Sequence, residues 1–477
     1  MCDPIVVLGG GPCGLSAAWE LADLGLPVRV IEKEWAPGGL CATVEQEGWR
    51  FDLGGHRFIT SNEKLQHRVL TLMGDIFVEA ERRSVVLAGG RRFRYPLEAR
   101  DLAKNLGLFE GARAIAGWGS EVLRRPFARR DDRTFEGWVT ARFGRPLYDR
   151  FFGPYTQKLW GMPPSEISGD WAAQRISLIN LGDVALRLAG LRRSEVRTYA
   201  RRYLYPRLGM GQMFARLATS LEDRDVGIDL GSEVTGLERM RDGRIGAVRF
   251  RCGSFECEVP CSAVISTIPL GTLVRHLRPE GDAELDVHAR RLRFRALRFL
   301  NIRLDLPEVS ENTWTYVSDR DVPVSRIQEP RNRSPEMAPA GRTSLMLEIP
   351  CEKGDRTWSA DDAELLSEML GHLRGLGFDL DRHVLGAAST WVEHGYPIYH
   401  LGYREDCEAL LTEVDRFENV WTAGRQGLFR YIFMDAAMEM GIEAARQAAT
   451  GRRGDRGRIY EHRREKQLLE TQALTAA

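Results

Sequence analysis

Three glycines near the start of the chain have the spacing of a turn that cradles a dinucleotide. Gly9, Gly11 and Gly14 stand in the order G-x-G-x-x-G. They follow the apolar run Ile5–Leu8, which we predict to be a strand, and precede a helical pattern over residues 15–24. Such glycines permit a tight bend, let a pyrophosphate approach the backbone and allow the helix to pack closely on the strand. The helix N-terminus then faces the phosphates.

Glu32 supplies the acidic residue that such a site needs, because it ends the next predicted strand, Val28–Ile31, and its carboxylate can accept hydrogen bonds from a ribose. NAD and FAD share these features, so residues further along the chain must decide between them. Further candidates for cofactor binding follow in the order expected for a flavin: Gly38, Gly39, Gly54, Gly55, Gly424, Arg425 and Asp435. Glycine lets backbone lie against a flat ring, and a helix beginning near Asp435 offers positive potential to a reduced flavin. The order favours FAD.

Composition narrows the class of protein. The 477 residues suggest two or three domains, and Lys plus Arg equal Asp plus Glu at 67 each, which argues against a nucleic-acid or membrane-surface partner. We find no secretory signal and no apolar run near the ~20 residues that span a bilayer. The eight cysteines are thinly spread, as in the cytoplasm, where we expect the protein to reside. Cys252, Cys257 and Cys261 lack the usual zinc spacing, so we expect free thiols and no metal site.

We predict an α/β fold built from a cofactor domain in separated pieces. Residues 1–64, 205–275 and 415–450 would form a Rossmann-type FAD-binding domain of the glutathione-reductase-like class. Residues 65–204, with helical spacing and many arginines, would form an inserted helical region, in which 100–190 is a candidate surface for a homo-oligomer. Residues 276–414, rich in strand patterns, would form an antiparallel β substrate domain. Residues 451–477 form a charged tail.

Several segments resemble the family of FAD enzymes that contains UDP-galactopyranose mutase, within the amine-oxidase and protoporphyrinogen-oxidase superfamily. They include GGHRFIT (54–60), KLWGMPPSEISGDWAAQRIS (158–177), VPVSRIQ (322–328), HGYPIY (394–399) and GRQGLFRY (424–431). The resemblance extends to about residue 450. The glycine motifs are common to the superfamily, whereas the segments around Arg175, Arg326 and Tyr396 are more specific to the mutase-like branch.

This resemblance implies a role for each matching residue. Gly55 would lend its carbonyl to flavin N5–H, and His56 would lie against the flavin ring. Arg175 and Arg326 would hold a substrate diphosphate, for which two guanidiniums offer forked donors. Aromatic residues would complete the substrate pocket: Tyr95, Trp160, Tyr316, Tyr396 and Tyr431. Trp160 has a bland alternative, since an aromatic residue at helical spacing is often part of the core.

The resemblance implies a mutase that isomerises a nucleotide-diphosphate sugar between pyranose and furanose forms through bonding of reduced flavin N5 to the sugar, with NADPH as a candidate external reductant. The alternative is an FAD-dependent dehydrogenase or oxidase that takes hydride from a small molecule or sugar, and a third class is a flavin-binding structural protein. Glu98 and Gln157 depart from the eukaryotic mutases in the region that holds uracil, which leaves the base open. Apolar residues at Phe433 and Met434 suggest a sugar less polar than galactose.

Overall fold

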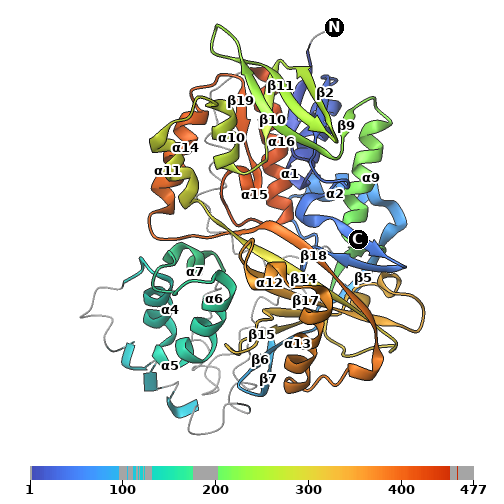
Figure 1. Ribbon diagram of the computed structural model, residues 1–477, viewed down its shortest axis with the longest axis vertical. Helices are drawn as coiled ribbons and strands as arrows, with labels where there is room; N and C mark the ends of the chain where they lie inside the picture. Colours follow the sequence, from blue (N-terminus) through green and yellow to red (C-terminus); the bar gives the residue numbers. More distant parts are fainter. Residues whose placement is uncertain are drawn as a thin grey trace.

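The computed structural model describes residues 3–95, 131–175 and 202–451, together with isolated positions between 105 and 123 and residue 459. Three parts are visible in Figure 1. A cofactor part with β1, β2, β13 and β19 lies at the top, a large sheet with β14, β17 and β18 lies below it, and a helical part with α4, α6 and α7 lies at the lower left.

A parallel sheet of five strands forms the centre of the cofactor part, in the order β19-β13-β1-β2-β9. Its strands come from widely separated stretches of the chain: β1 Ile5–Leu8, β2 Val28–Ile31, β9 Gly227–Asp229, β13 Ala263–Ser266 and β19 Val420–Thr422. All four residues of β1 are buried, because the sheet is covered on both faces. Helices α1 (Pro12–Asp23) and α16 (Met434–Thr450) pack so closely that a Cβ on Gly441 would lie 2.0 Å from the Cys13 carbonyl oxygen. The Rossmann-type fold is confirmed.

Smaller elements surround this sheet. A three-stranded antiparallel sheet consists of β10 (Ser232–Arg239), β11 (Ile245–Cys252) and β12 (Phe255–Pro260). The flanking elements are β3 Thr43–Gln46, β4 Trp49–Asp52, α2 Glu63–Met73, α9 Gly211–Glu222, α10 Leu270–Leu277, α11 Ala283–Arg291 and α14 Tyr403–Val414. The three cysteines between 252 and 261 are free thiols on or beside β11 and β12.

The second large sheet has seven strands in the order β18-β14-β17-β16-β15-β6-β7. Its bounds are β6 Ser84–Ala88, β7 Arg91–Tyr95, β14 Phe294–Leu304, β15 Trp314–Val317, β16 Arg326–Gln328, β17 Thr343–Cys351 and β18 Val384–Pro397. Its neighbouring strands are antiparallel except β15 and β6, which run parallel. Every residue of β17 is buried, so this strand lies in the core of the sheet and its polar residues require partners.

Residues 77–95 differ from the helical region that we predicted between 65 and 204. They form three strands, β5 (Phe77–Glu81), β6 and β7, and β5 pairs with β8 (Arg202–Pro206). The run Val85-Val86-Leu87 favours a strand, and Gly89 and Gly90, both at positive φ, form the turn between β6 and β7. The substrate sheet therefore recruits residues 84–95 in addition to residues after 276, because β6 completes a ladder with β15.

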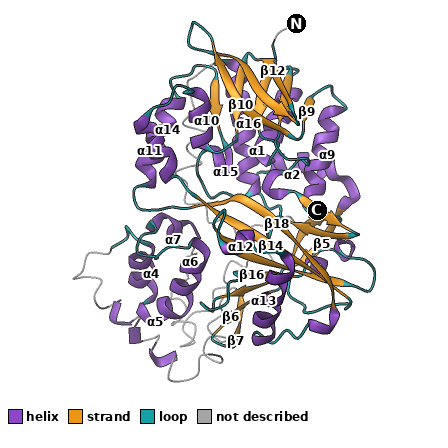
Figure 2. Cartoon of the chain, viewed as in Figure 1, coloured by secondary structure: helices purple, strands orange, loops and turns teal. Residues whose placement is uncertain are grey.

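The helical part contains α4 (Phe135–Phe143), α5 (Arg145–Leu147), a π-helical turn (Tyr148–Phe152), α6 (Gly153–Trp160) and α7 (Gly169–Arg175). Thr134 caps α4 by accepting a hydrogen bond from the Gly137 amide, as a threonine at this position commonly does. Figure 2 shows these helices grouped beside the strands of the large sheet. Residues 96–104 and 176–201, which also belong to the predicted helical region, lie outside the described residues, as does most of the tail.

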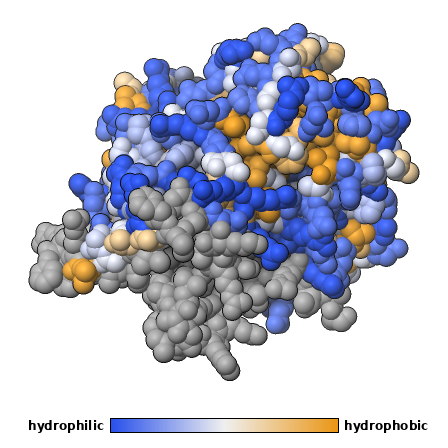
Figure 3. All heavy atoms as spheres, turned by 90° about the horizontal axis from the view of Figure 1, so that it is seen from below, coloured by the Kyte–Doolittle hydropathy of each residue, from blue (hydrophilic) through white to orange (hydrophobic). Residues whose placement is uncertain are grey.

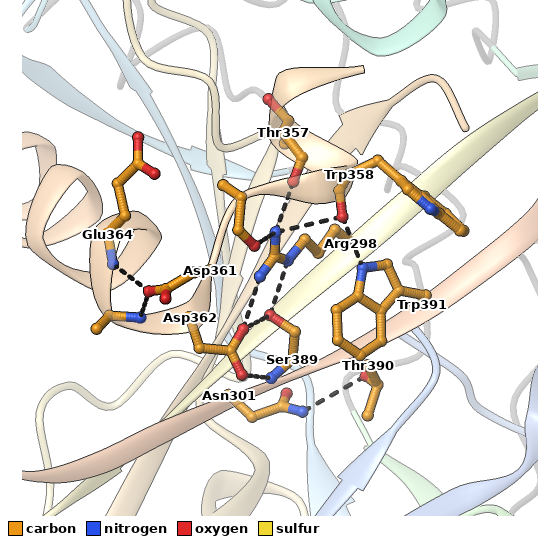
Figure 4. Close-up of polar contacts among 12 residues, drawn as sticks. Arg298, Asn301, Thr357, Trp358, Asp361, Asp362, Glu364, Ser389, Thr390 and Trp391 are labelled. Carbon is orange, nitrogen blue, oxygen red and sulfur yellow. Dashed lines mark hydrogen bonds and ion pairs between the residues drawn. The ribbon is translucent and has the colours of Figure 1, made fainter. Parts of the chain in front are cut away.

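A buried arginine attaches two helices to the large sheet (Figure 4). Arg298 on β14 donates to the Ser389 hydroxyl at 2.8 Å and to the Asp362 carboxylate at 2.6 Å. It also donates to the carbonyl oxygens of Thr357 and Ala360, both at 2.7 Å. These partners belong to β18 and to the segment carrying α12 (Arg356–Ser359) and α13 (Asp362–Gly375), so one guanidinium joins three elements.

The exterior is mainly polar. On the face in Figure 3 hydrophilic residues predominate, and hydrophobic residues gather right of the centre. Within the described ranges, no helix combines the length and apolar composition that crossing a bilayer requires.

Candidate functional site

The glycine turn after β1 has no room for side chains. Gly9 adopts a φ of 102°, and a Cβ on Gly14 would lie 1.9 Å from the Gly9 carbonyl oxygen. Gly11 is the N-cap of α1 and supplies no side-chain cap, so the first amides of the helix remain available to a ligand. The geometry predicted for a phosphate-binding turn is therefore present.

Glu32 and the second glycine pair border this turn. The Glu32 carboxylate accepts hydrogen bonds from the amides of Gly10 at 2.5 Å and Glu34 at 2.8 Å. Burial raises the pKa of Glu32, and these two amides oppose that rise. The Gly38 amide donates to the Gly10 carbonyl at 2.8 Å, and a Cβ on Gly39 would lie 3.2 Å from the Gly11 Cα. The structure thus brings Gly38 and Gly39 onto the first turn.

The third glycine pair lies where the cofactor part meets the large sheet. Gly54 has a φ of 143°, and a Cβ there would lie 2.8 Å from Cε1 of His56. Burial, together with the positive charges of Arg425 and Arg326, lowers the pKa of His56 to about 3, so its imidazole is neutral at physiological pH. Its Nδ1 atom is buried and has no hydrogen-bond partner among the described residues. A buried ring nitrogen without a partner is what a cofactor or substrate group would satisfy.

Arg326 lies directly against this pair. A Cβ on Gly55 would be 2.6 Å from Nη1 of Arg326, so the glycine is required for the guanidinium to approach. Arg326 donates from Nε to the Glu348 carboxylate at 2.9 Å, donates to the same carboxylate from Nη2, and lies 3.4 Å from the Tyr396 hydroxyl. Tyr396 in turn donates to Glu348 at 3.0 Å. Burial lowers the pKa of Arg326, but the Glu348 carboxylate outweighs it and raises the pKa well above its usual value.

The predicted aromatic residues form two chains of ring contacts around Arg326. In one chain Tyr316 lies 5.1 Å from Tyr95 and 6.3 Å from Tyr155 between ring centroids. In the other, Tyr396 lies 5.4 Å from Tyr431 and 6.0 Å from Trp160. Tyr316 also stands opposite Arg326 in the pairing of β15 with β16. The structure therefore brings together all five aromatic residues expected to bind substrate, although Trp160 is almost completely buried and acts as their support.

Gly424, Arg425 and Asp435 also assemble at the cofactor part. Gly424 has a φ of 83° and begins the short helix α15 (Gly424–Gly427) after β19. Arg425 lies over the Tyr431 ring at 4.6 Å and donates to the Ile432 carbonyl at 2.6 Å. Asp435 is buried in the first turn of α16, and this burial raises its pKa to about 7. These three residues, which come late in the sequence, thus lie in the cofactor part.

Three residues that we expected to contact the substrate are not placed in this group of aromatic residues and Arg326: Arg175, Glu98 and Gln157. Arg175 ends α7, but its side chain lies outside the described residues, and so does Glu98. The side-chain oxygen of Gln157, which we expected near a base, accepts a hydrogen bond from Arg320. The pairing of Arg175 with Arg326 on a diphosphate therefore stays a prediction.

Sequence reasoning missed Glu348 and Tyr155. Glu348 is 2% exposed in the apolar strand β17, directly opposite Arg326 in the pairing of β16 with β17. A carboxylate inside a run such as Leu345-Met346-Leu347-Glu348-Ile349 is a signal that a buried cation must lie nearby. Tyr155 precedes Trp160 on α6 and gave no separate signal, because only the fold brings it to Tyr316.

The residues present fit FAD. The glycine cradle excludes side chains, Glu32 stands at the end of β2 for a ribose, and α16 begins beside the site, so its N-terminus offers positive potential to the flavin. Fold and site together define a flavoprotein with a Rossmann-type cofactor domain and an antiparallel substrate domain, and its cofactor is FAD.

The model of the family of flavin containing amine oxidoreductases matches residues 12–449, and the chain belongs to that family. A phytoene dehydrogenase from Streptomyces griseus is 23% identical over 466 residues, which covers 83% of this chain and 84% of the relative. Reduced UDP-galactopyranose mutase has a similar structure, with a TM-score of 0.82 and 22% identity over 96% of this chain and 98% of that one. Cyclohexylamine oxidase from Brevibacterium oxydans has a TM-score of 0.66 at 17% identity, covering 94% and 99%. These likenesses establish the fold of an FAD-dependent oxidoreductase family.

Proposed function

We propose that this flavoenzyme acts on a nucleotide-diphosphate sugar and interconverts the pyranose and furanose forms of the sugar. The observation that carries the proposal is the state of Arg326. Its Nε and Nη2 are engaged by Glu348 and Tyr396, whereas Nη1 adjoins Gly55 and has no hydrogen-bond partner among the described residues. A guanidinium N–H group left open beside a candidate flavin-binding glycine is suited to donate a hydrogen bond to a phosphate oxygen.

The tyrosines support the same kind of ligand. Burial raises the pKa of Tyr155 and of Tyr396, so both phenols stay protonated at neutral pH; Tyr396 spends its proton on Glu348, whereas Tyr155 can donate to a ligand. The hydroxyl of Tyr316 has no hydrogen-bond partner in the described part of the chain, and its ring lies between those of Tyr95 and Tyr155. Neutral donors of this kind bind a diphosphate without adding charge that would have to be desolvated.

A second cation is needed, because Glu348 already neutralises Arg326. Arg175 is the candidate by position, since it follows Trp171 by one turn of α7 and Trp171 lies 5.0 Å from Tyr431. Arg425 lies over the ring of Tyr431, 4.6 Å from its centroid. Arg175 and Arg326 would together bind the charge of the diphosphate, while the tyrosines fix its orientation.

When bound and reduced, FAD supplies an electron-rich nitrogen that can bond to the anomeric carbon as the nucleotide diphosphate departs. The protein's part is to hold that leaving group and to exclude water from the reacting carbon. The neutral imidazole of His56, whose buried Nδ1 has no partner among the described residues, can orient a substrate hydroxyl or cofactor group by a hydrogen bond, and its low pKa keeps it uncharged.

The similarity to reduced UDP-galactopyranose mutase also supports this proposal. The test is a panel of nucleotide sugars that differ in base and sugar, each incubated with enzyme in the oxidised form and after reduction by dithionite or NADPH. A furanose product from the reduced enzyme alone is the expected result. Conversion at equal rates by both forms, or conversion of no nucleotide sugar by either, would contradict it.

An oxidoreductase that removes hydride from an apolar substrate is the second candidate. Ile432 and Phe433 precede α16 and Met434 begins it; Ile432 and Met434 are buried, so this side of the site is apolar. The similarity to a phytoene dehydrogenase over most of the chain points in the same direction. Under this alternative, anaerobic substrate bleaches oxidised FAD in a 1:1 ratio, whereas the mutase leaves the absorbance of oxidised FAD unchanged.

A further inference from the structure

The hairpin of β15 and β16 carries two residues of the proposed substrate pocket on its two strands. Tyr316 stands near the end of β15 and Arg326 begins β16, and the two are opposite each other. Between them the chain runs through a loop, residues 318–325. Only one backbone hydrogen bond, from the Val317 amide to the Ser325 carbonyl at 3.0 Å, closes the hairpin beyond that pair. The outer edges of the two strands are held by the pairing of β15 with β6 and of β16 with β17, so the contacts of the loop determine how the closed end of the hairpin is placed.

A single ammonium group from another part of the molecule holds it. Nζ of Lys158, on α6, lies 2.6 Å from the Val317 carbonyl oxygen and 2.9 Å from each of the carbonyl oxygens of Asp319, Val322 and Val324. An ammonium has three hydrogens, so four carbonyls share them and the loop is drawn around one point. Without that donor, carbonyl groups beside the fully buried Val317 and Val324 would lose their partner.

Further hydrogen bonds from the helical part and from the turn between β6 and β7 reinforce this arrangement. Gln157, the residue before Lys158, accepts a hydrogen bond from Arg320 in the loop. The Ser318 hydroxyl donates to the Phe151 carbonyl at 3.2 Å, and the Gly89 amide donates to Asp319 at 2.6 Å. The loop is thus hydrogen-bonded to the helical part and to the turn between β6 and β7. Lys158 makes the largest number of these hydrogen bonds.

Helix α6, which carries Lys158, also contacts both chains of aromatic residues. It follows Tyr155 by three residues, so the two side chains share one face of α6, and Tyr155 contacts Tyr316 of the hairpin. Trp160, two residues later, contacts Tyr396, which is joined to Arg326. Burial lowers the pKa of Lys158 to about 7, and the negative charge of the Asp319 carboxylate opposes this shift.

We propose that Lys158 is a positioning residue for the substrate site: its ammonium group fixes the loop of residues 318–325, so that Tyr316 and Arg326 keep the mutual placement that a diphosphate requires. The pocket side chains themselves do not touch Nζ, so Lys158 acts through the hairpin. The claim about diphosphate binding depends on the proposed function, whereas the claim about the hairpin does not.

Hydrogen exchange of the FAD-loaded full-length chain tests the hairpin claim without any substrate. The variant Lys158→Met keeps the length of the side chain and removes the charge and the donors. We expect the amides of Val317, Ser318 and Ser325 to exchange at least 10-fold faster, because each bonds within or beside this loop. The matched control is Lys353→Met, since within the described part of the chain the Lys353 ammonium pairs only with the partly exposed Glu393 on β18. Unchanged exchange in Lys158→Met would overturn the proposal.

Steady-state kinetics then separate positioning from mere folding. With a nucleotide sugar that the wild type converts, Lys158→Met should raise KM about 10-fold while kcat changes less than threefold, because loss of placement weakens ground-state and transition-state binding alike. Faster exchange with an unchanged KM would make Lys158 a structural residue only and would overturn the positioning role.

Failure of the proposed function is distinguishable from failure of this inference. If the wild type converts no nucleotide sugar and binds no nucleoside diphosphate, whatever its base, in calorimetry, the diphosphate assignment is lost, and the exchange rates alone decide whether Lys158 holds the hairpin. If Lys158→Met does not accumulate with FAD, Lys158→Arg is measured instead. It retains the charge on a longer, planar group, and a smaller rise in exchange at the same amides is expected. Exchange equal to wild type in Lys158→Arg and an intact KM would count against the proposal.

Discussion

Two buried arginines of the seven-stranded sheet, Arg298 on β14 and Arg326 on β16, differ in how their donors are used. The side chain of Arg298 is 1% exposed, and all three of its nitrogens donate to Asp362, Ser389 or backbone carbonyls. The side chain of Arg326 is 14% exposed, and two of its nitrogens are held by Glu348 and Tyr396 while the third has no partner among the described residues. The same residue type, on strands of one sheet, thus occurs in a closed and an open state.

The difference separates a structural group from a candidate binding group. A guanidinium whose donors are all engaged has nothing left for a ligand, so the Arg298 cluster serves to dock α12 and α13 on the sheet (Figure 4). A guanidinium with an open nitrogen beside a glycine of the cofactor site can still gain a partner. Burial of an arginine therefore does not by itself indicate a binding role; at Arg326 the open nitrogen also lies beside Gly55.

Removing Arg298 should have the largest effect on stability. Arg298→Ala removes the cationic partner of Asp362, which keeps only its hydrogen bonds from Ser389, and leaves two loop carbonyls without their donor. We expect the free energy of unfolding to fall by about 3 kcal/mol, at the low end for breaking a buried pair because Asp362 is partly exposed. The measurement is the urea midpoint of the FAD-loaded protein. Activity per folded molecule should be unchanged. A loss of kcat/KM with an unchanged midpoint would reverse the assignment of the two arginines.

Arg326→Lys should have the next largest effect, this time on activity. Lysine keeps the charge opposite Glu348 and loses the forked donors. Transition-state stabilisation should therefore fall by about 2 kcal/mol, which lowers kcat/KM for the nucleotide sugar roughly 30-fold. The urea midpoint should change by less than that of Arg298→Ala. We choose lysine because Arg326→Ala would leave Glu348 buried and unpaired, which would lower stability for a separate reason. An unchanged kcat/KM would remove Arg326 from the site.

The cofactor site could be predicted from the sequence because its signals are local. Gly9, Gly11 and Gly14 sit in a contiguous strand–turn–helix, and their spacing is fixed by the backbone approach that a pyrophosphate requires. The predicted strands Ile5–Leu8 and Val28–Ile31 have the observed bounds for the same reason, since each is a short apolar run between glycine-rich or charged segments.

The partners of Arg326 could not be predicted, because they depend on strand pairing. Glu348 reaches Arg326 only through the register of β16 with β17, and residues 84–88 enter the sheet only through β15. A strand pattern shows which residues share a face but not which strand lies alongside. The family resemblance supplied Arg326 and four tyrosines, yet it did not indicate that a carboxylate already neutralises the arginine.

Two aspartates at helix N-termini extend the comparison to pH. Asp362, at the start of α13, has a lowered pKa because Ser389 and Arg298 outweigh its burial, whereas burial raises the pKa of Asp435 to about 7. A carboxyl with a raised pKa holds its proton in the folded state while the unfolded chain has lost it, so stability falls as pH rises from about 4 to 7. The lowered pKa of Asp362 gives a pH dependence of the opposite sign: its contribution to stability is lost only as the pH falls into the acid range.

We therefore expect Asp435→Asn, which cannot ionise, to remove a pH dependence. Between pH 5 and pH 8 the wild type should lose about 1 to 2 kcal/mol more stability than the variant, discounted from the full shift of a buried carboxyl. Urea midpoints of both FAD-loaded proteins at the two pH values give the difference. Parallel pH profiles would show that Asp435 is ionised throughout this range.

The smallest expected effect distinguishes an open phenol from an engaged one. Tyr316→Phe removes a hydroxyl that has no partner in the described part of the chain, so stability should stay within about 0.5 kcal/mol while KM rises about fivefold, which is about 1 kcal/mol of lost binding. Tyr399→Phe is the matched control, because its buried hydroxyl accepts the Tyr431 amide at 2.8 Å. That variant should lose about 1 kcal/mol of stability, since the amide is left without an acceptor. If Tyr316→Phe destabilises the fold and leaves KM unaltered, Tyr316 is engaged like Tyr399, and the open state is confined to Arg326.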